Sequence, residues 1–431
     1  MPNLANRPFM ENFLIPRRFV RIKALQNLYA YTISKVAHKN ETIEQVKKDF
    51  TFDPFLHTPD QKEPLAKQQS IAVAAFTEAV AAAFPMQDFA YVGNKKMEQS
   101  SHFLHYLEAL KKEETLLQNG FNQSKKSIYT GILYTLLLLV EWYKLAKATY
   151  NPAQPAAHLL KTHLAQDPLL EELYHNASWM NAMGKNGISW VKDQDQVQNW
   201  YRQFIETREV PKSYGADPNN NNRSLLKPIC DEEFLGEAQS STAAYSDVCE
   251  EHRQASTPKL PLEIEFQKRS SVELLEDMFQ KIIFQEGPIN DFLAMTDLYW
   301  DEHKRMVKKF LTRIFTMRFT QDFSAFMLFW DHPKWAIEEG FYNRLLTTVI
   351  QNDALYEAMI GQNAEKWDRE RILLTDKLIL KLALAELLNF KDIPFKVSIN
   401  EYIEIAKWYG TSKSACFING VLEGILKGLN K

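Results

Sequence analysis

Cysteine, glycine and proline are sparse in this chain, and their scarcity limits what it can be. Three cysteines among 431 residues, Cys230, Cys249 and Cys416, are widely spaced, form no CxxC pair and have no pair of histidines nearby. They indicate neither a disulfide framework nor a zinc site, and they fit a reducing compartment, so we expect a cytoplasmic protein. With 14 glycines and 18 prolines, the composition is that of an ordinary globular protein.

Long apolar segments are also missing. The strongest apolar run, residues 128–140 (IYTGILYTLLLLV), has 13 residues and is followed at once by Glu141. A membrane span requires about 20 apolar residues, so we predict a buried helix here and no association with a membrane. The first ten residues contain Asn, Arg and Pro with little apolar length, so we expect no export signal.

The motifs of common enzymes are absent as well. The sequence has no Gly-rich phosphate loop, no GxSxG and no HExxH. His102 and His105 are three residues apart, but no carboxylate or further histidine at ligand spacing supports them. Asp301, Glu302 and His303 adjoin one another without forming a known catalytic pattern. We therefore predict a protein that is not an enzyme and needs no cofactor or metal.

Apolar residues recur three and four positions apart through most of the chain, and no stretch keeps the alternation of a strand. This periodicity predicts an all-α fold. The first helix is expected at roughly residues 17–35, after Pro16. Residues 372–390 are apolar on nearly every face, which is typical of a helix surrounded by others. Further helices are expected at residues 72–84, 124–150, 272–284, 301–316 and 337–350.

Charge is unevenly distributed although the net charge is only −3. Residues 1–35 carry a net charge of +5 and residues 365–431 carry +2, which leaves −10 for the middle of the chain. If the two ends pack together, they form a local positive surface of the kind that contacts nucleic acid. Solvated arginines near a terminus are the simpler alternative.

The C-terminal region carries the densest local signals. Residues 393–422 read IPFKVSINEYIEIAKWYGTSKSACFINGVL. Pro394 makes an extended turn of residues 391–395, Ser398 with Glu401 three residues later predicts a capping box that begins the next helix, and Gly410 ends that helix. Glycines then recur four apart, which predicts a stripe where another helix backbone approaches closely: Gly420, Gly424 and Gly428.

Four ordered elements of this region resemble the C-terminal signature of the NusB family. They are the helix at residues 374–388 (LTDKLILKLALAELL), the DIP turn, the INE helix start and the FINGVL helix. The N-terminal RRFVRIKALQNLYAY is similar to the opening of the same proteins. Residues 190–372 resemble a long variant of the family in part, whereas residues 52–123 and 216–268 look like additional insertions.

The resemblance implies a division of the chain. Residues 1–35 supply the basic segment and first helix of a NusB-like helical bundle, and residues 36–215 form a helical extension. Residues 216–268, rich in Asn, Ser and Pro, are expected to form a polar, mobile insertion. Residues 269–431 form a helical region that contains the C-terminal part of the bundle, at residues 365–431.

The resemblance also implies a function. NusB pairs with NusE, a small-subunit ribosomal protein, and the pair binds boxA RNA so that RNA polymerase reads through terminators, notably in ribosomal RNA operons. Cations for phosphate, an aromatic face for stacking and amides for base edges are suited to single-stranded RNA. The implied RNA-binding residues are Arg17, Arg18, Arg21, Gln26, Phe395, Lys396 and Asn400. From spacing alone, Asn400 and Asn419 are better explained as cap or turn residues, and only the resemblance favours contact with RNA.

The NusE surface implied by the resemblance includes Tyr29, Glu370, Asp376 and Asp392. From the residues alone, Asp376 and Glu386 are equally consistent with intramolecular caps or ion pairs, and Asp392 with an Asx-type turn. An alternative function is a non-enzymatic scaffold for protein interactions, derived from the NusB fold, whose acidic middle is the binding surface.

Overall fold

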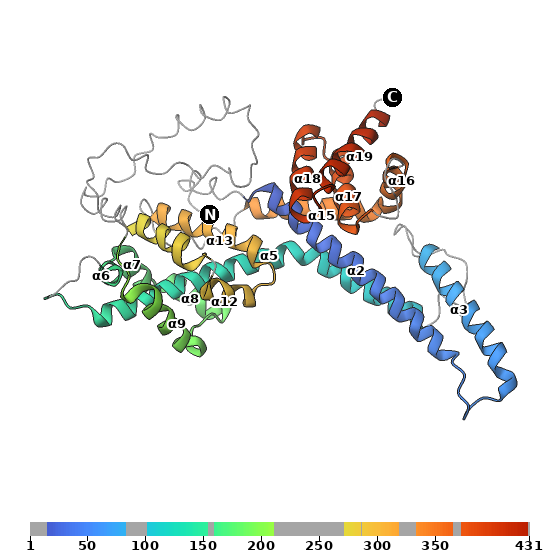
Figure 1. Ribbon diagram of the computed structural model, residues 1–431, viewed down its shortest axis with the longest axis horizontal. Helices are drawn as coiled ribbons and strands as arrows, with labels where there is room; N and C mark the ends of the chain where they lie inside the picture. The colour runs from blue at the N-terminus through green and yellow to red at the C-terminus, as the bar shows by residue number, and fades with distance from the viewer. Residues whose placement is uncertain are drawn as a thin grey trace. The chain divides into compact units, whose positions relative to one another are not determined.

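The computed structural model describes residues 15–82, 101–153, 159–210, 271–285, 287–318, 333–364 and 372–429. Within these ranges the regular elements are helices, joined by turns and one isolated bridge between Leu159 and Glu209 (Figure 1). The predicted all-α fold is therefore confirmed. The predicted polar insertion at residues 216–268 lies outside the described residues.

The chain divides into two compact units, and each is described by itself. One unit combines residues 15–122 with residues 336–431, and the other lies within residues 123–335. The first contains α2 (Arg17–Asp49), α3 (Lys62–Ala82), α16 (Asp353–Asn363), α17 (Leu374–Asn389), α18 (Phe395–Tyr409) and α19 (Ser414–Leu429). It also takes the first part of α5 (Ser101–Thr149) and most of α15 (Pro333–Gln351). The four-part division expected from the sequence stays a prediction.

Helix α17 is the central helix of the first unit. Every residue from Leu378 to Leu387 is buried, including the charged Lys381 and Glu386. Helices α2, α16, α18 and α19 all pack against it (Figure 1). The prediction of a helix surrounded by others is confirmed, because a helix that is apolar on nearly all faces is stable only when neighbours cover each of them.

Helix α2 is longer than its sequence pattern predicts. It begins directly after Pro16 and continues to Asp49, not to about residue 35. Its second half packs with α3 and the start of α5, whose apolar side chains form a separate small core: Phe76, Ala79, Val80, Phe103, Tyr106 and Leu110. The apolar pattern does not predict this extension, because residues 36–49 are mostly polar and only Thr42 and Val46 among them are buried.

Two local predictions for the C-terminal helices are wrong. Helix α18 begins at Phe395, with Pro394 as its N-cap and no side-chain cap. Ser398 and Glu401 therefore lie inside the helix and form no capping box. A side chain at Gly424 would lie 3.0 Å from Asn363, but at Gly420 and Gly428 it would meet nothing within 4 Å. The glycines therefore do not form a stripe against a neighbouring helix backbone within the described part of the chain.

The second unit is built around the remainder of α5. The predicted buried helix is confirmed there, because Ile132, Leu133, Leu136 and Leu139 are fully buried. By length and composition α5 could cross a membrane, but 72% of its most apolar stretch is buried inside the fold, as in the core helix of a soluble protein. Around it lie α6 (Leu160–Ala165), α7 (Pro168–His175), α8 (Ala177–Asn186), α9 (Gln194–Tyr201), α12 (Pro288–Thr296) and α13 (Trp300–Arg318).

Helix α7 is capped by a buried carboxylate. Asp167 accepts hydrogen bonds from the backbone N–H groups of Leu169 and Leu170, at 2.9 and 3.0 Å, and is 2% exposed. Burial raises the pKa of Asp167 to about 6, against the opposing effect of its hydrogen bonds, which lower it. The folded-state pKa is thus above the ordinary value of about 3.9. Ionisation of Asp167 consequently costs folding free energy as the pH rises from about 4 through 6.

Asp167→Asn is expected to remove this pH dependence while it keeps an oxygen acceptor for the helix start. Relative to wild type, the variant gains about 2–3 kcal/mol in free energy of unfolding between pH 4 and pH 7, since each pKa unit corresponds to about 1.4 kcal/mol. Urea denaturation of both proteins across this range measures the difference. A difference that stays constant with pH would contradict the expectation.

Candidate nucleic-acid interface

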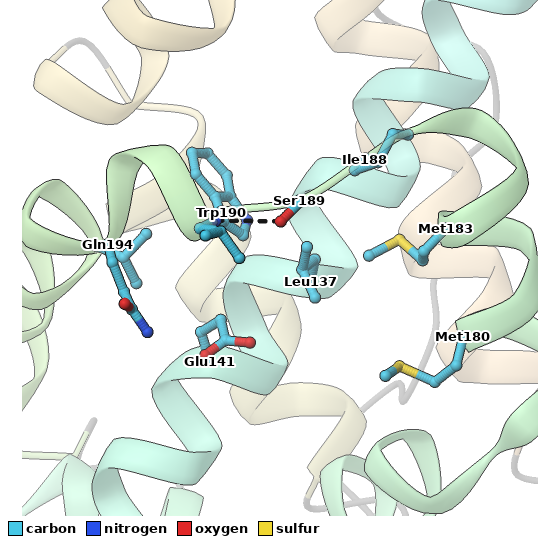
Figure 2. Close-up of a pocket in the computed structure, with 11 residues that line it drawn as sticks. Leu137, Glu141, Met180, Met183, Ile188, Ser189, Trp190 and Gln194 are labelled. Atoms are coloured by element: carbon cyan, nitrogen blue, oxygen red, sulfur yellow. Dashed lines mark hydrogen bonds between the residues drawn. The ribbon is translucent and has the colours of Figure 1, made fainter.

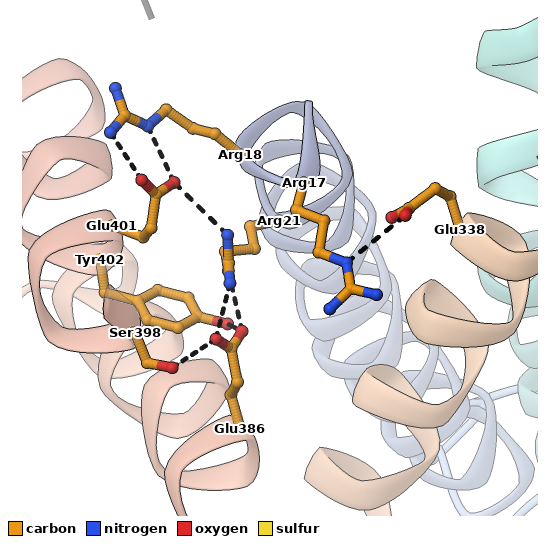
Figure 3. Close-up of polar contacts among 8 residues, drawn as sticks. All are labelled: Arg17, Arg18, Arg21, Glu338, Glu386, Ser398, Glu401 and Tyr402. Atoms are coloured by element: carbon orange, nitrogen blue, oxygen red, sulfur yellow. Dashed lines mark hydrogen bonds and ion pairs between the residues drawn. The ribbon is translucent and has the colours of Figure 1, made fainter. Parts of the chain in front are cut away.

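Arg21, near the start of α2, faces the buried carboxylate of Glu386 on α17 (Figure 3). Arg21 donates two hydrogen bonds to Glu386, from Nε at 2.8 Å and from Nη2 at 2.7 Å. Ser398 and Tyr402 of α18 donate to the same carboxylate, at 2.6 and 3.0 Å. Glu386 is fully buried and its carboxylate accepts four hydrogen bonds, so the ion pair considered for it from sequence is confirmed.

The electrostatics of this cluster favour the charged state of both partners. Burial alone would raise the pKa of Glu386, but the hydrogen bond and charge of Arg21 lower it below its ordinary value, helped by Ser398 and Tyr402. Burial also opposes the charge of Arg21, yet the hydrogen bond to Glu386 and the nearby negative charge raise the pKa of that guanidinium. A bidentate arginine–carboxylate pair of this kind fixes geometry as well as charge.

A second carboxylate joins α2 to α18. Arg18 donates from Nε and Nη2 to the two oxygens of Glu401, at 2.9 and 2.7 Å, and Arg21 reaches the same residue at 3.4 Å. The Arg18 side chain is 7% exposed. Arg18 and Arg21, both predicted from the resemblance to contact RNA, are therefore held by carboxylates of the same unit. Their direct contact with RNA stays a prediction.

Arg17 is directed away from Glu386 and toward α15 (Figure 3). It pairs with Glu338 of α15 at 3.4 Å, and its guanidinium carbon lies 5.0 Å from the centre of the Phe341 ring. The Arg17 side chain is 43% exposed, whereas Glu338 is mostly buried. Of the three arginines in the opening motif, Arg17 is thus the most accessible to an RNA phosphate.

The first turns of α18 carry the exposed members of the predicted RNA set. Phe395 is 58% exposed, and Lys396 and Asn400 are exposed and four residues apart on the same face of the helix. The first two turns of α18 thus expose an aromatic ring, an ammonium group and an amide. Gln26 is half-buried, accepts a hydrogen bond from Lys23 at 2.9 Å and donates to Tyr409 at 3.3 Å.

The predicted NusE-facing residues lie in different surroundings. Tyr29 is 42% exposed on α2, and Asp392 is exposed in the turn before α18. Asp376 is 5% exposed and accepts a hydrogen bond from Ser414 at 3.0 Å, and burial raises its pKa despite that bond. Glu370 lies outside the described residues. The structure thus leaves Tyr29 and Asp392 accessible, while Asp376 joins α17 to the start of α19.

The histidines considered as metal ligands or catalytic groups, His102 and His303, contact carboxylates of the fold. His102 contacts Asp49 at 2.6 Å, and the buried His303 contacts Asp297 at 2.6 Å. Among the residues that the structure describes, no cluster of His, Cys, Asp and Glu could hold a metal ion.

A pocket of about 280 Å³ lies in the second unit (Figure 2). Its wall is mainly apolar and includes Met180, Met183 and Trp190. The carboxylate among its lining residues, Glu141, is paired with Lys144 at 2.8 Å. The pocket carries no nucleophile with an adjacent base and no pair of carboxylates, so its lining supports no specific reaction.

The described residues form helices, and among them α18 exposes an aromatic ring and a lysine at its start and is joined to α2 by ion pairs of Glu401. A sequence model of the NusB family matches residues 318–427. The Transcription antitermination protein NusB of Bacillus mycoides is 42% identical over 102 residues, which are 22% of this chain and 78% of that protein. The chain belongs to the NusB family.

Two further relatives carry the same name. The protein of Thermodesulfovibrio yellowstonii is 43% identical over 89 residues, or 21% of this chain and 59% of the relative. The protein of Chloroherpeton thalassium is 43% identical over 85 residues, or 20% of this chain and 40% of the relative. The chain thus spans only 59% and 40% of the lengths of these two relatives. The family match falls on the C-terminal quarter, and most of the additional helical regions lie outside it.

Several residues around the arginines of α2 cannot be recognised from the sequence alone. The sequence pattern assigns Glu401 to a capping box, and it contains no signal for the aromatic rings Phe341 and Phe390 or for Arg344, which lies over Phe390. Arg21 and Glu386 are 365 positions apart, so local spacing contains no signal for their pairing. The one available clue was a glutamate within an otherwise apolar helix, because a carboxylate in such a position requires a partner.

Proposed function

We propose that this chain is a transcription antitermination factor. It binds boxA-type single-stranded RNA together with NusE and promotes read-through by RNA polymerase, notably in ribosomal RNA operons, in the cytoplasm and without enzymatic activity. The observation that carries the proposal is the exposed group of Phe395, Lys396 and Asn400 on α18. This group lies within the segment that matches the NusB family.

The predicted RNA-binding residues divide into two roles in this proposal. Phe395 stacks on a base, Lys396 and Arg17 meet phosphates, and Asn400 reads a base edge. Arg18 and Arg21 support this surface by holding α2 against α17 and α18 through Glu386 and Glu401. Gln26, which is bonded to Tyr409 at the end of α18, is proposed as a further contact with RNA.

NusE is the proposed protein partner. Tyr29 and Asp392 are accessible for direct contact, and Glu370 is proposed as a further contact. Asp376 contributes by positioning, because its carboxylate is buried against Ser414 at the start of α19. Loss of this hydrogen bond would shift the start of α19, and so weaken NusE binding indirectly.

A transcription assay tests the function. With purified RNA polymerase, NusE and a template that carries boxA before a terminator, the wild-type protein should increase read-through. Lys396→Gln should reduce that increase, whereas Lys427→Gln should preserve it, because Lys427 is an exposed lysine near the end of α19 that pairs with Glu423. Read-through that is independent of both the protein and boxA would refute the proposal.

A further inference from the structure

Two arginines and two phenylalanines form a layered group in the first unit. Arg17 lies over Phe341 at 5.0 Å, Phe341 meets Phe390 edge-on at 5.2 Å, and the Arg344 guanidinium carbon lies 4.3 Å from the centre of the Phe390 ring. The group joins three helices, since Arg17 is on α2, Phe341 and Arg344 are on α15, and Phe390 ends α17. Each guanidinium is therefore held on an aromatic face.

Arg344 is both anchored and exposed. Its Nη2 donates to the backbone oxygen of Asn389 at 2.5 Å, at the C-terminal end of α17 where a cation is favourable. Within the described ranges, no carboxylate is paired with Arg344. Arg18 and Arg21, by contrast, are occupied by Glu401 and Glu386. Arg344 thus keeps most of its five N–H donors for a ligand.

The place of Arg344 connects it to the RNA surface. Phe390, on which it lies, directly precedes the turn at residues 391–394 that leads into Phe395 and Lys396. That turn carries one exposed lysine, Lys391, and one exposed carboxylate, Asp392. A planar guanidinium held in one orientation matches the oxygens of a phosphate.

We propose that Arg344 is a further phosphate contact for single-stranded RNA, which extends the surface of Phe395, Lys396 and Asn400 from α18 onto α15. The inference rests on the proposed RNA-binding function. The group of Arg17, Phe341, Phe390 and Arg344 holds the two guanidiniums in place before RNA arrives, so less side-chain freedom is lost on binding. A purely structural alternative is that Arg344 only caps the end of α17.

Fluorescence anisotropy with a labelled boxA-type RNA, measured across a salt series with NusE present, separates the two roles. Arg344→Gln keeps an N–H donor for the Asn389 oxygen and removes the charge. It should weaken binding roughly threefold to tenfold and lower the slope of log affinity against log salt by about 0.7, the value for one phosphate on a single strand. Arg344→Lys should keep the wild-type slope, and Lys427→Gln should change neither quantity.

The same measurements distinguish a wrong assignment of Arg344 from a wrong assignment of RNA binding to the protein. If wild type binds and Arg344→Gln has the wild-type slope, the phosphate contact is overturned while RNA binding stands. An affinity loss with an unchanged slope and a lower urea midpoint would assign Arg344 to the end of α17 and also overturn the inference. Absence of binding by wild type itself would refute the proposed function.

Discussion

Arg21→Ala should lower the free energy of unfolding of the first unit by about 3–5 kcal/mol, the cost of leaving a buried carboxylate without its charged partner. Glu386 is fully buried, and Arg21 supplies two of its four hydrogen bonds. Because the pKa of Glu386 is lowered in the folded state, the stability from this pair is present above about pH 4 and is lost as the pH falls. Urea denaturation at pH 7 measures the effect.

Arg17→Ala is the matched control. Arg17 is 43% exposed and makes one 3.4 Å contact with Glu338, so its removal should cost about 1 kcal/mol or less. A double-mutant cycle with Arg21→Met and Glu386→Gln should show strong coupling between the two residues. If Arg21→Ala unfolds at the same urea concentration as Arg17→Ala, the structural role of the buried pair is wrong.

Phe395→Ala combined with Lys396→Gln should weaken boxA RNA binding by about fivefold to 150-fold through the loss of stacking alone, and further through the loss of the lysine. Stacking of one base on an aromatic side chain contributes about 1–3 kcal/mol, and loss of the ammonium removes a phosphate contact in addition. The fold should be unaffected, because Phe395 is 58% exposed and Lys396 is exposed. Anisotropy gives the affinity, and circular dichroism with urea denaturation checks the fold.

Val397→Ala serves as the control for this double variant. Val397 is 45% exposed on the same turn of α18 but carries neither charge nor an aromatic ring. Its affinity for RNA should stay within about twofold of wild type. Equal losses for Val397→Ala and the double variant would show that the turn as a whole, and not its aromatic and basic groups, determines binding.

Single replacements are needed to test whether the arginines of the opening motif contact RNA. Simultaneous replacement of Arg17, Arg18 and Arg21 by alanine would remove the charged partners of two buried or half-buried carboxylates, Glu386 and Glu401. The loss of these ion pairs would destabilise the fold, so weaker RNA binding by such a protein would not identify an RNA contact. Single replacement of Arg17, or of Lys396 on α18, tests RNA contact without this complication.

Helix content and the central position of α17 could be predicted, because burial on all faces leaves a continuous apolar pattern in residues 374–388. The length of α2 could not, since its second half contacts its neighbours through few apolar side chains. The start of α18 was misplaced because Ser398 and Glu401 have the residue types of a capping box. In the fold Glu401 accepts hydrogen bonds from Arg18 and Arg21, and Ser398 donates one to Glu386. The Arg18 and Arg21 contacts join residues far apart in the sequence, so no local pattern predicts them.

For the candidate site, exposure was the property that sequence could not supply. The resemblance placed seven residues on an RNA surface, but Arg18 and Arg21 are buried while Phe395, Lys396 and Asn400 are exposed. Asp376, expected near a partner, is enclosed beside Ser414. A family pattern shows which positions belong together, whereas packing decides which of them a ligand can reach.

Anisotropy of a labelled boxA RNA with the wild-type protein, with and without NusE, directly tests RNA binding and its dependence on NusE. We expect binding that NusE strengthens and that weakens with salt by about 0.7 log units per log unit of salt for each phosphate contacted. A scrambled RNA should bind more weakly. If a protein that circular dichroism shows to be folded binds no boxA RNA at low salt, with or without NusE, the proposed RNA-binding function is refuted. A protein-binding scaffold is then favoured.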